Sequence, residues 1–381
     1  MDITVYEDAE LLHSQWLELE AEAACSVYQR YDWIAQWTAH VGVKAKIRPV
    51  FFVGRLGRDT QFIMPMGLHK RGPFHVLSWL GDSHTNFHMG LYAPSFLAKV
   101  KPDEFKRLIE ALTTSLASSL GRVDVLELCC QPISWQGHTN PFTYLPRQAS
   151  HNHGFALDLR PSFDEALKRK NGARKRKKLR WQTNQLKPHG GFTVARAETP
   201  SEVDAALDAA FGQMALRFDR AGIWNRFNDP GVEVFMRTLA KASLGSDEPP
   251  MVVYSLNIDG GIRATFAGGH LGDQFSGFFI SYADDRFSHI SPGELIIHQV
   301  IKDCAESGTN LFDFGRGQER YKTSWCDVTI PMFDTCIALS RFGLLFAAYD
   351  TLKLLAKRSV RNNARLWNLA KSVRRRLYGR I

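Results

Sequence analysis

The 381-residue sequence contains little cysteine, and its spacing matches no known cysteine-based site. The six cysteines, at positions 25, 129, 130, 304, 326 and 336, form no CxxC pair and no metal-ligand spacing. This pattern excludes a disulfide framework and a zinc ribbon. We therefore expect a reducing compartment and no metal site.

Targeting and membrane-spanning patterns are also missing. The start of the chain, MDITVYEDAELL, lacks the positive charge and apolar run of a signal peptide. The longest apolar stretch, 337–356, is interrupted by Arg341, Asp350 and Lys353 and is not expected to span a bilayer. These features predict a cytoplasmic protein.

Acidic residues are absent from two segments that carry much of the positive charge. Nine Lys or Arg lie between Lys168 and Arg180, and ten more follow from Lys353 to the end. Without these nineteen residues the formal net charge of +9 becomes −10. The body of the protein is therefore acidic, and the high pI reports only on two segments that can meet polyanions. Peripheral contact of the second segment with an anionic inner membrane is one hypothesis; a solvated basic arm is the alternative for each.

Length and patterning predict an α/β protein with mixed sheets and two related halves. With 44% hydrophobic and 12% aromatic residues, the chain can bury the cores of more than one domain. Both halves read as a strand, helices, several strands, a helix and a strand. The predicted division is an N-terminal domain at 1–160, a basic connecting helix at 161–190, a C-terminal domain at 191–340 and a basic helical tail at 341–381. Gly172 is a weak point in the connecting helix, and Asp259-Gly260 predicts a hairpin.

The segment from Gln274 to Trp325 carries most of the functional information. It reads as a strand, a turn ending Ser291-Pro292-Gly293, an apolar-periodic helix, the short strand LFDFG and a Gly-Arg-Gly loop. A helix with Pro in its first turn presents unpaired amides and the positive end of its dipole, which together favour an anion. An ordinary helix cap is the simpler interpretation of the same residues.

The run SPGELIIHQVIKDCAESGTNLFDFGRGQERYKTSW, at 291–325, resembles the CelD-like acetyltransferases of the GNAT superfamily. The basic stretch RKRKKLRW, the segment RFDRAG and the early DWIAQW also fit that family. More distantly, the chain is similar to FemAB-type aminoacyl transferases, which share a paired-GNAT architecture. The resemblance implies two GNAT-like domains in tandem and acetyl-CoA or another acyl-CoA as co-substrate.

The resemblance also implies where the acyl donor binds. The strand Phe275–Tyr282 would offer backbone amides to the thioester carbonyl, around Phe279 and Ile280. The loop that holds the CoA pyrophosphate corresponds to His289, Ser291, Pro292, Gly293 and Glu294. This loop departs from the usual Q/R-x-x-G-x-G/A pattern, because it keeps only Gly293, after a proline.

Asp313 is the first candidate for a catalytic base, with Glu319 as the second. Asp313 lies between Phe312 and Phe314, and an apolar setting raises the pKa of a carboxyl group toward that of a useful base. The alternative is a structural Asp bonded to amides of the following Gly-rich loop.

Lys322 is a candidate for electrostatic catalysis, since the matching lysine of FemAB relatives contacts the carbonyl or phosphate of the substrate. Arg316, Tyr321 and Trp325 are candidates for substrate binding; Arg316 lies between two glycines, where it can clamp an anion. A solvated Lys and a surface-loop Arg are the alternatives. Asn86 and His88 are further candidates for the acceptor cleft, and His298 is expected in the core.

The resulting hypothesis is an acyl-CoA-dependent N-acyltransferase, most simply an acetyltransferase, that acts on a small-molecule or glycan acceptor such as a polysaccharide precursor. Transfer would be direct, because no Cys or Ser has the arrangement of an activated nucleophile. A FemAB-like transferase that uses aminoacyl-tRNA is the first alternative. A non-catalytic protein that binds nucleic acid or an anionic membrane through its basic segments is the second.

Overall fold

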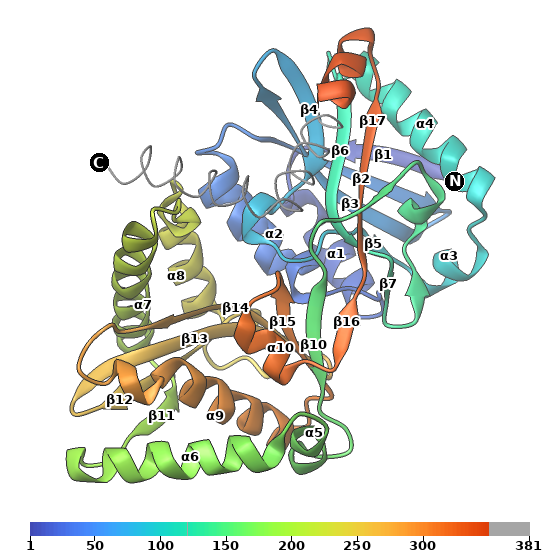
Figure 1. Cartoon of the computed structure of the whole chain (residues 1–381). Helices are drawn as coiled ribbons and strands as arrows, with labels where there is room; N and C mark the ends of the chain where they lie inside the picture. Colours follow the sequence, from blue (N-terminus) through green and yellow to red (C-terminus); the bar gives the residue numbers. More distant parts are fainter. Residues whose placement is uncertain (120, 350–381) are drawn as a thin grey trace.

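The computed structural model describes residues 1–119 and 121–349 and contains two mixed sheets with helices around them (Figure 1). The expected α/β class with mixed sheets in two halves is confirmed. No helix in these two ranges is long and apolar enough to cross a membrane.

The first sheet is built mainly from the N-terminal part of the chain. It has the strand order β1-β2-β3-β4-β6-β17-β9, with β5 paired to β3. The strands are β1 (Asp2–Tyr6), β2 (Arg48–Leu56), β3 (Asp59–Arg71), β4 (Phe74–Trp79), β5 (Leu91–Tyr92), β6 (Val125–Pro132), β9 (Gln148–Ala149) and β17 (Met332–Ala338). Strands β4 and β6 are parallel, and α3 (Pro94–Lys99) and α4 (Pro102–Ser119) lie in the connection between them. Helices α1 (His13–Glu20) and α2 (Tyr31–Trp37) pack beside this sheet, and β7 (Ser134–Trp135) and β8 (His138–Thr139) form a separate hairpin.

The second sheet has the order β11-β12-β13-β14-β15-β10-β16. Its strands are β10 (Gly154–Asp158), β11 (Thr193–Arg196), β12 (Val252–Ile258), β13 (Gly261–Leu271), β14 (Gln274–Tyr282), β15 (Leu311–Arg316) and β16 (Val328–Ile330). Only β14 and β15 pair in parallel, and α9 (Pro292–Glu306) connects them. Residues 259 and 260 turn β12 into β13 with φ of 51° and 70°, so the predicted hairpin is confirmed.

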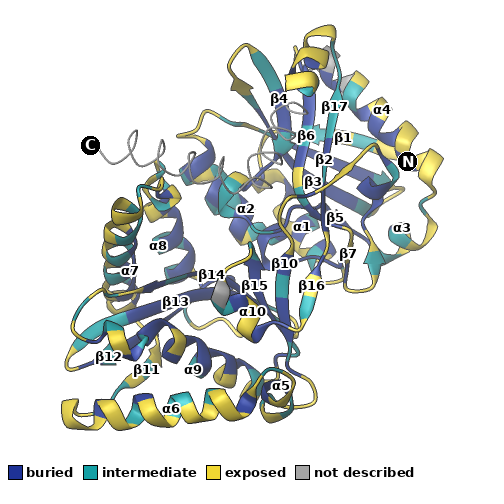
Figure 2. Ribbon diagram, in the orientation of Figure 1, coloured by how far each residue is buried: buried dark blue, intermediate teal, exposed yellow. Residues whose placement is uncertain are grey.

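Helices cover both faces of the second sheet. Helices α5 (Phe163–Arg169), α6 (Gly172–Leu186) and α9 share one core with it. Helix α7 (Pro200–Ala221) packs on the other face, and α8 (Val232–Ala242) packs against α7 and α2. Figure 2 shows that α6 is mostly exposed. Asn171, with φ of 58°, separates α5 from α6, and a Cβ on Gly172 would lie 2.8 Å from the Leu167 carbonyl oxygen. The predicted weak point is therefore a real helix break.

Two strands cross between the halves, and the predicted boundaries at 160 and 340 do not follow the sheets. Strand β10 joins the second sheet between β15 and β16, although it precedes residue 160. Strand β17 leaves the second half and pairs with β6 in the first sheet. A strand pattern shows that a segment is extended, but the available sheet edges decide which sheet it joins.

The start of the predicted tail also belongs with the first sheet and not with the second domain. Residues 341–349 are helical, and the buried Phe346 packs on Val76 and Val125. A Cβ on Gly343 would lie 2.0 Å from the Asp124 carbonyl oxygen, so the backbones are in close contact. The basic segment from Lys353 lies outside the described residues.

Aromatic side chains join the two halves into one core. Trp33 of α2 lies 5.1 Å from the Phe235 ring of α8 and 4.7 Å from the Phe278 ring of β14, between ring centroids. Tyr28 completes the group, 5.0 Å from Trp33 and 5.5 Å from Phe278. We call these four residues the aromatic junction. Because one apolar cluster runs through it, the halves hold a fixed relation to each other.

Replacing Trp33 with Ala should lower the free energy of unfolding by about 3–5 kcal/mol, because it leaves a large cavity in the aromatic junction. Trp181→Ala is the matched control, since that indole is 43% exposed on α6. Chemical denaturation of the two variants checks this. Equal losses in both would show that the junction does not carry the contact between the halves.

Candidate active site

A cavity of about 1110 Å³ opens between the two halves. Its walls come from the loop after β4, the end of α7 and the following loop, β14, the start of α9, and the segment from β15 to α10 (Arg320–Trp325). The cavity thus brings both halves to one place, as an enzyme with a donor and an acceptor requires.

The two parallel strands part at the floor of this cavity. Pairing between β14 and β15 ends at Ser276 and Asp313, although β14 continues to Tyr282 and β15 to Arg316. A bulge in β14 opposes Gly277 to Gly268 and Phe279 to Ala267, so that Phe278 is the extra residue. Beyond Ser276, the edge of β14 that faced β15 has no strand partner, and residues 277–280 line the cavity.

The first turn of α9 lies against the end of β14. Ser291 has φ of 62° and its hydroxyl does not cap the helix, while Pro292 occupies the first turn as expected. A Cβ on Gly293 would lie 3.0 Å from Tyr282 Cδ1, so glycine permits this close approach. The helix therefore presents its amino end and positive dipole to the cavity with little side-chain bulk.

Most of the predicted donor residues lie together. Six of the seven line the cavity: Phe279, Ile280, Ser291, Pro292, Gly293 and Glu294. His289 does not; it is exposed, and its Nδ1 lies 2.8 Å from the Arg286 carbonyl oxygen. The turn before Ser291 directs its side chain away from the cavity.

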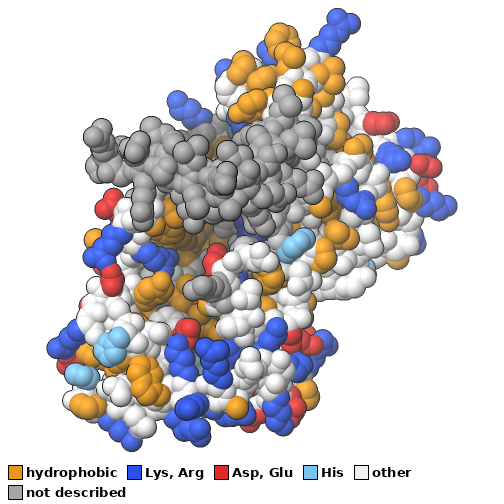
Figure 3. Space-filling view, in the orientation of Figure 1, with side chains coloured by type: hydrophobic (Ala, Val, Ile, Leu, Met, Phe, Trp, Pro, Cys, Tyr) orange, Lys and Arg blue, Asp and Glu red, His pale blue; other side chains and the backbone are white. Residues whose placement is uncertain are grey.

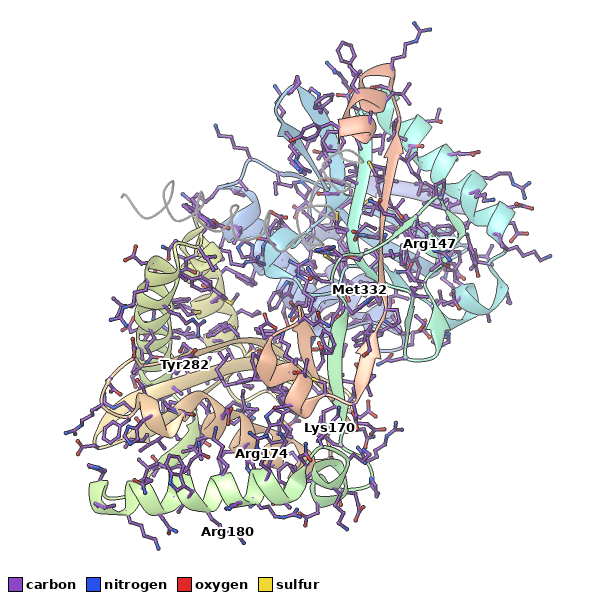
Figure 4. All side chains as sticks on the ribbon, in the orientation of Figure 1. Arg147, Lys170, Arg174, Arg180, Tyr282 and Met332 are labelled. Carbon is purple, nitrogen blue, oxygen red and sulfur yellow. The ribbon has the colours of Figure 1, made fainter. Side chains whose placement is uncertain are left out.

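Arg217 is a cavity residue to which sequence reasoning gave no role. It projects from α7, donates to the Ile280 carbonyl oxygen at 3.3 Å, and lies over the Tyr282 ring at 5.1 Å. In the described part of the chain it has no carboxylate partner in an ion pair. The RFDRAG segment was the only signal, and it does not show which strand the helix faces. Figure 4 labels Tyr282 at the end of β14.

Asp313 is fully buried beside the point where the strands part. Its Oδ1 accepts the Gly315 amide at 2.7 Å, and its Oδ2 is buried without a hydrogen-bond partner. Burial raises its pKa to about 7, against the opposing effects of the Gly315 amide, the Lys322 charge and the Ser276 hydroxyl. The carboxylate does not line the cavity, whereas Phe314 beside it does. The structure thus contains both the raised pKa of the catalytic hypothesis and the amide contact of the structural one.

The first half closes over this position through Asn86. Its Nδ2 donates to the Tyr28 hydroxyl at 2.6 Å and to the Gly277 carbonyl oxygen at 3.4 Å, and it lines the cavity. A Cβ on Gly315 would lie 2.3 Å from this Nδ2, so only glycine leaves room for the Asn86 side chain at this position. His88 does not reach the cavity: it is buried, its Nδ1 lies 3.0 Å from the Cys129 carbonyl oxygen, and burial lowers its pKa to about 3.

Lys322 is buried and not a solvated surface residue. Its Nζ donates to the Arg316 carbonyl oxygen at 2.7 Å and lies 2.8 Å from Glu319 Oε2. Lys322, Glu319, Arg316 and Tyr321 all line the cavity.

Trp325 is the predicted substrate residue that the structure places elsewhere. It is buried in the core between α9 and α6, where Lys175 Nζ lies 4.0 Å from its ring centroid and the His298 ring lies 5.8 Å away. His298 is buried beside it, as the sequence predicted. Tryptophan spacing in a motif does not reveal that the indole faces a neighbouring helix.

Comparison with known proteins is consistent with this geometry. Residues 173–323 match the family described as an acetyltransferase (GNAT) domain. No curated protein sequence matches the chain. The match identifies a GNAT acetyltransferase domain within the second half of the chain.

Several solved structures share the fold at low sequence identity. A conserved protein from Bacteroides thetaiotaomicron matches with a TM-score of 0.59 at 13% identity, covering 89% of this chain and 100% of that one. FemX matches with a TM-score of 0.59 at 10% identity, covering 88% and 97%. The C-terminal domain of a putative lysylphosphatidylglycerol synthetase from Agrobacterium fabrum matches with a TM-score of 0.53 at 13% identity, covering 91% and 97%. These matches establish the fold alone.

The raised pKa of Asp313 predicts a pH dependence of stability. The folded-state pKa of about 7 lies above the unfolded value of 3.8, so the fold favours the protonated carboxyl. The contribution of Asp313 to the free energy of unfolding should fall by a total on the order of 4 kcal/mol as pH rises from about 4 to 7. It should stay low above that pH. Asp313→Asn should remove this fall, and denaturation of both proteins between pH 4 and 8 measures it.

Asp103→Asn is the matched control, because that carboxylate is 84% exposed, and the fall caused by Asp313 should persist in it. Parallel profiles for Asp313→Asn and the unaltered protein would show that the buried carboxyl is not held neutral.

Proposed function

We propose that the protein transfers an acyl group, most simply acetyl, from acyl-CoA to an amine of a sugar or polysaccharide precursor. The observation that carries this proposal is the parting of β14 and β15 directly beside the amino end of α9. An extended donor with a pyrophosphate at one end and a thioester at the other fits that arrangement.

The donor would be held by backbone and by one cation. The first turn of α9, opened by Gly293, supplies amides and dipole for the pyrophosphate. Arg217 adds a guanidinium at the same end of β14, where its contacts are a carbonyl oxygen and an aromatic ring. The free edge of β14 after Ser276 would meet the thioester carbonyl and stabilise the oxyanion that forms there.

Transfer further requires that the acceptor amine lose a proton. Asp313 is the proposed proton acceptor because burial holds its pKa at about 7. Since its carboxylate does not line the cavity, the proton would reach it through an intervening group; Glu319, which lines the cavity, is the direct alternative. Lys322, held between Glu319 and the Arg316 carbonyl, would stabilise negative charge on the acceptor side.

The proposed transfer is direct: the acceptor nitrogen bonds to the acyl carbon as the carbon–sulfur bond of the thioester breaks, and CoA leaves as a thiolate that takes up a proton. Among the described residues no cysteine lines the cavity. Cys130 lies nearby as a contact of Arg316, and burial raises the pKa of the Cys130 thiol. A thiol nucleophile is therefore not part of the proposal.

An aminoacyl-tRNA donor is the second candidate, favoured by the position of α6. Its Lys178 pairs with Glu294 at the start of α9, so the basic helix runs past the proposed donor site. Lys and Arg gather over this helix in the lower part of Figure 3, and Figure 4 labels Arg174 and Arg180 along it and Lys170 just before it, at the end of α5. Saturable binding of acetyl-CoA but not of tRNA would support the first candidate, and the reverse result the second.

Gly293→Val tests the pyrophosphate site. The added side chain must displace Tyr282 and fill the space before the helix, so CoA binding should weaken by about 1–3 kcal/mol, the scale of lost charge-assisted hydrogen bonds. Gly212→Val is the matched control, because a Cβ on Gly212 meets nothing within 4 Å. Calorimetric titration with CoA measures both; unchanged affinity in a folded Gly293→Val protein contradicts the assignment.

Asp313→Asn tests the base. It keeps size and hydrogen bonding but cannot accept the proton, so turnover of acetyl-CoA with an amino-sugar acceptor should fall by about 10²–10⁴, with CoA affinity little changed. The rise of rate with pH through about 7 should disappear in this variant. Release of free thiol measures the reaction.

Two companion variants separate the roles in that test. Glu319→Gln should leave the rate within a few-fold if Asp313 is the base, and Lys322→Met should weaken use of the acceptor while keeping the pH profile. Near-normal turnover of Asp313→Asn would assign that residue to structure and turn attention to Glu319.

A further inference from the structure

Two guanidinium groups from separate parts of the second half meet at one carbonyl of the first half. Arg226 opens the short helix after α7, and Arg316 ends β15. Arg226 Nη1 donates to the Ser83 carbonyl oxygen at 2.5 Å, and Arg316 Nη2 donates to the same oxygen at 3.3 Å. All three residues line the cavity.

Within residues 1–119 and 121–349, neither arginine is neutralised by an ion pair. Asp229, the acidic residue nearest in sequence to Arg226, is engaged by His84 Nε2 at 3.3 Å and by Trp224 Nε1 at 3.0 Å. The pKa of Arg226 is lowered, first by burial and then by the charge of Arg316, while Asp82 and Asp229 act in the opposite direction. Two like charges that share one neutral oxygen repel each other, and an anion between them would relieve that repulsion.

The arginine pair is positioned by a hydrogen-bonded frame. Trp37 Nε1 donates to His84 Nδ1 at 3.3 Å, so the His84 proton lies on Nε2, which faces the Arg226 carbonyl oxygen at 3.2 Å. The Asn225 side chain caps the turn by accepting the Phe227 amide at 3.2 Å. These contacts tie the loop after α7 to the loop after β4. They therefore fix the backbone position of Arg226.

We propose that Arg226 and Arg316 together bind an oxyanion, a phosphate or carboxylate, of the acceptor molecule. The planar guanidinium fork matches both oxyanions with paired hydrogen bonds. This subsite lies where these two segments of the second half meet Ser83 of the first half, and it is distinct from the amino end of α9, which the donor would use. The inference rests on the proposed transfer reaction and adds that the acceptor is acidic.

The test titrates inorganic pyrophosphate into protein whose donor site is saturated with CoA. Arg226→Gln and Arg316→Gln should each weaken pyrophosphate binding roughly 10- to 100-fold and leave CoA affinity unchanged. Arg58→Gln, in the exposed β2–β3 turn, is the matched control and should change neither. A parallel titration uses acetate in place of pyrophosphate. Tighter binding of acetate would identify the acceptor's oxyanion as a carboxylate.

Two further measurements separate this inference from its alternatives. Gly293→Val should not alter pyrophosphate binding to the CoA-saturated protein; equal loss there would place the ion in the donor site and overturn the proposal. Arg226→Lys and Arg316→Lys keep the charge but lose the fork, so they should bind pyrophosphate more weakly than the unaltered protein while retaining its melting temperature. A lowered melting temperature with unchanged pyrophosphate affinity would show that the pair only joins the halves.

If CoA does not bind at all, the donor proposal fails and the arginine pair is still tested by the same variants without CoA. Loss of pyrophosphate binding in the two arginine variants, and not in Gly293→Val, would then support the oxyanion subsite by itself.

Discussion

The parting of β14 from β15 is the constraint on which the site depends. Two parallel strands that stop pairing after Ser276 and Asp313 leave an open edge, and the connection through α9 brings a helix start to that edge. The bulge at Phe278 adds to this, because it places two successive phenylalanines, Phe278 and Phe279, on the same face of the sheet. Both line the cavity, and Phe278 also enters the aromatic junction. The same local irregularity therefore opens the donor edge and fixes the first half against it.

The shared core explains how one cavity can be built from two halves. Tyr28 and Trp33 pack on Phe278 and Phe235, and the exchanged strands β10 and β17 tie each half to the sheet of the other. Inter-domain motion is the usual expectation for small polar interfaces, but a continuous apolar cluster opposes it. Residues of the first half such as Ser83 and Asn86 can then act as fixed parts of the site.

Charge is distributed in the site according to the task of each wall. The proposed donor wall combines a helix dipole with Arg217, and the proposed acceptor wall carries Arg226, Arg316 and Lys322. The carboxylates at the cavity rim, Asp284, Glu294 and Glu319, are paired with cations of their own. Among the described residues that line the cavity, the arginines without an ion-pair partner, Arg217, Arg226 and Arg316, lie at the two places where the proposed reaction has anions.

The sequence by itself determined the local elements: the helix break at Gly172, the hairpin at Asp259-Gly260, the Pro-Gly start of α9 and the strand that carries Asp313. These follow from backbone preferences and short-range periodicity, which a single sequence contains. It also indicated most of the donor wall, because those residues are close together along the chain.

Only the tertiary structure decided which sheet β10 and β17 join, that His289 and Trp325 face away from the cavity, and that Asp313 lies behind its floor. The meeting of Arg226 with Arg316 at Ser83 was equally beyond the sequence. Each of these depends on contacts between segments far apart along the chain, and the periodicity of one segment does not say which partner its side chains will meet.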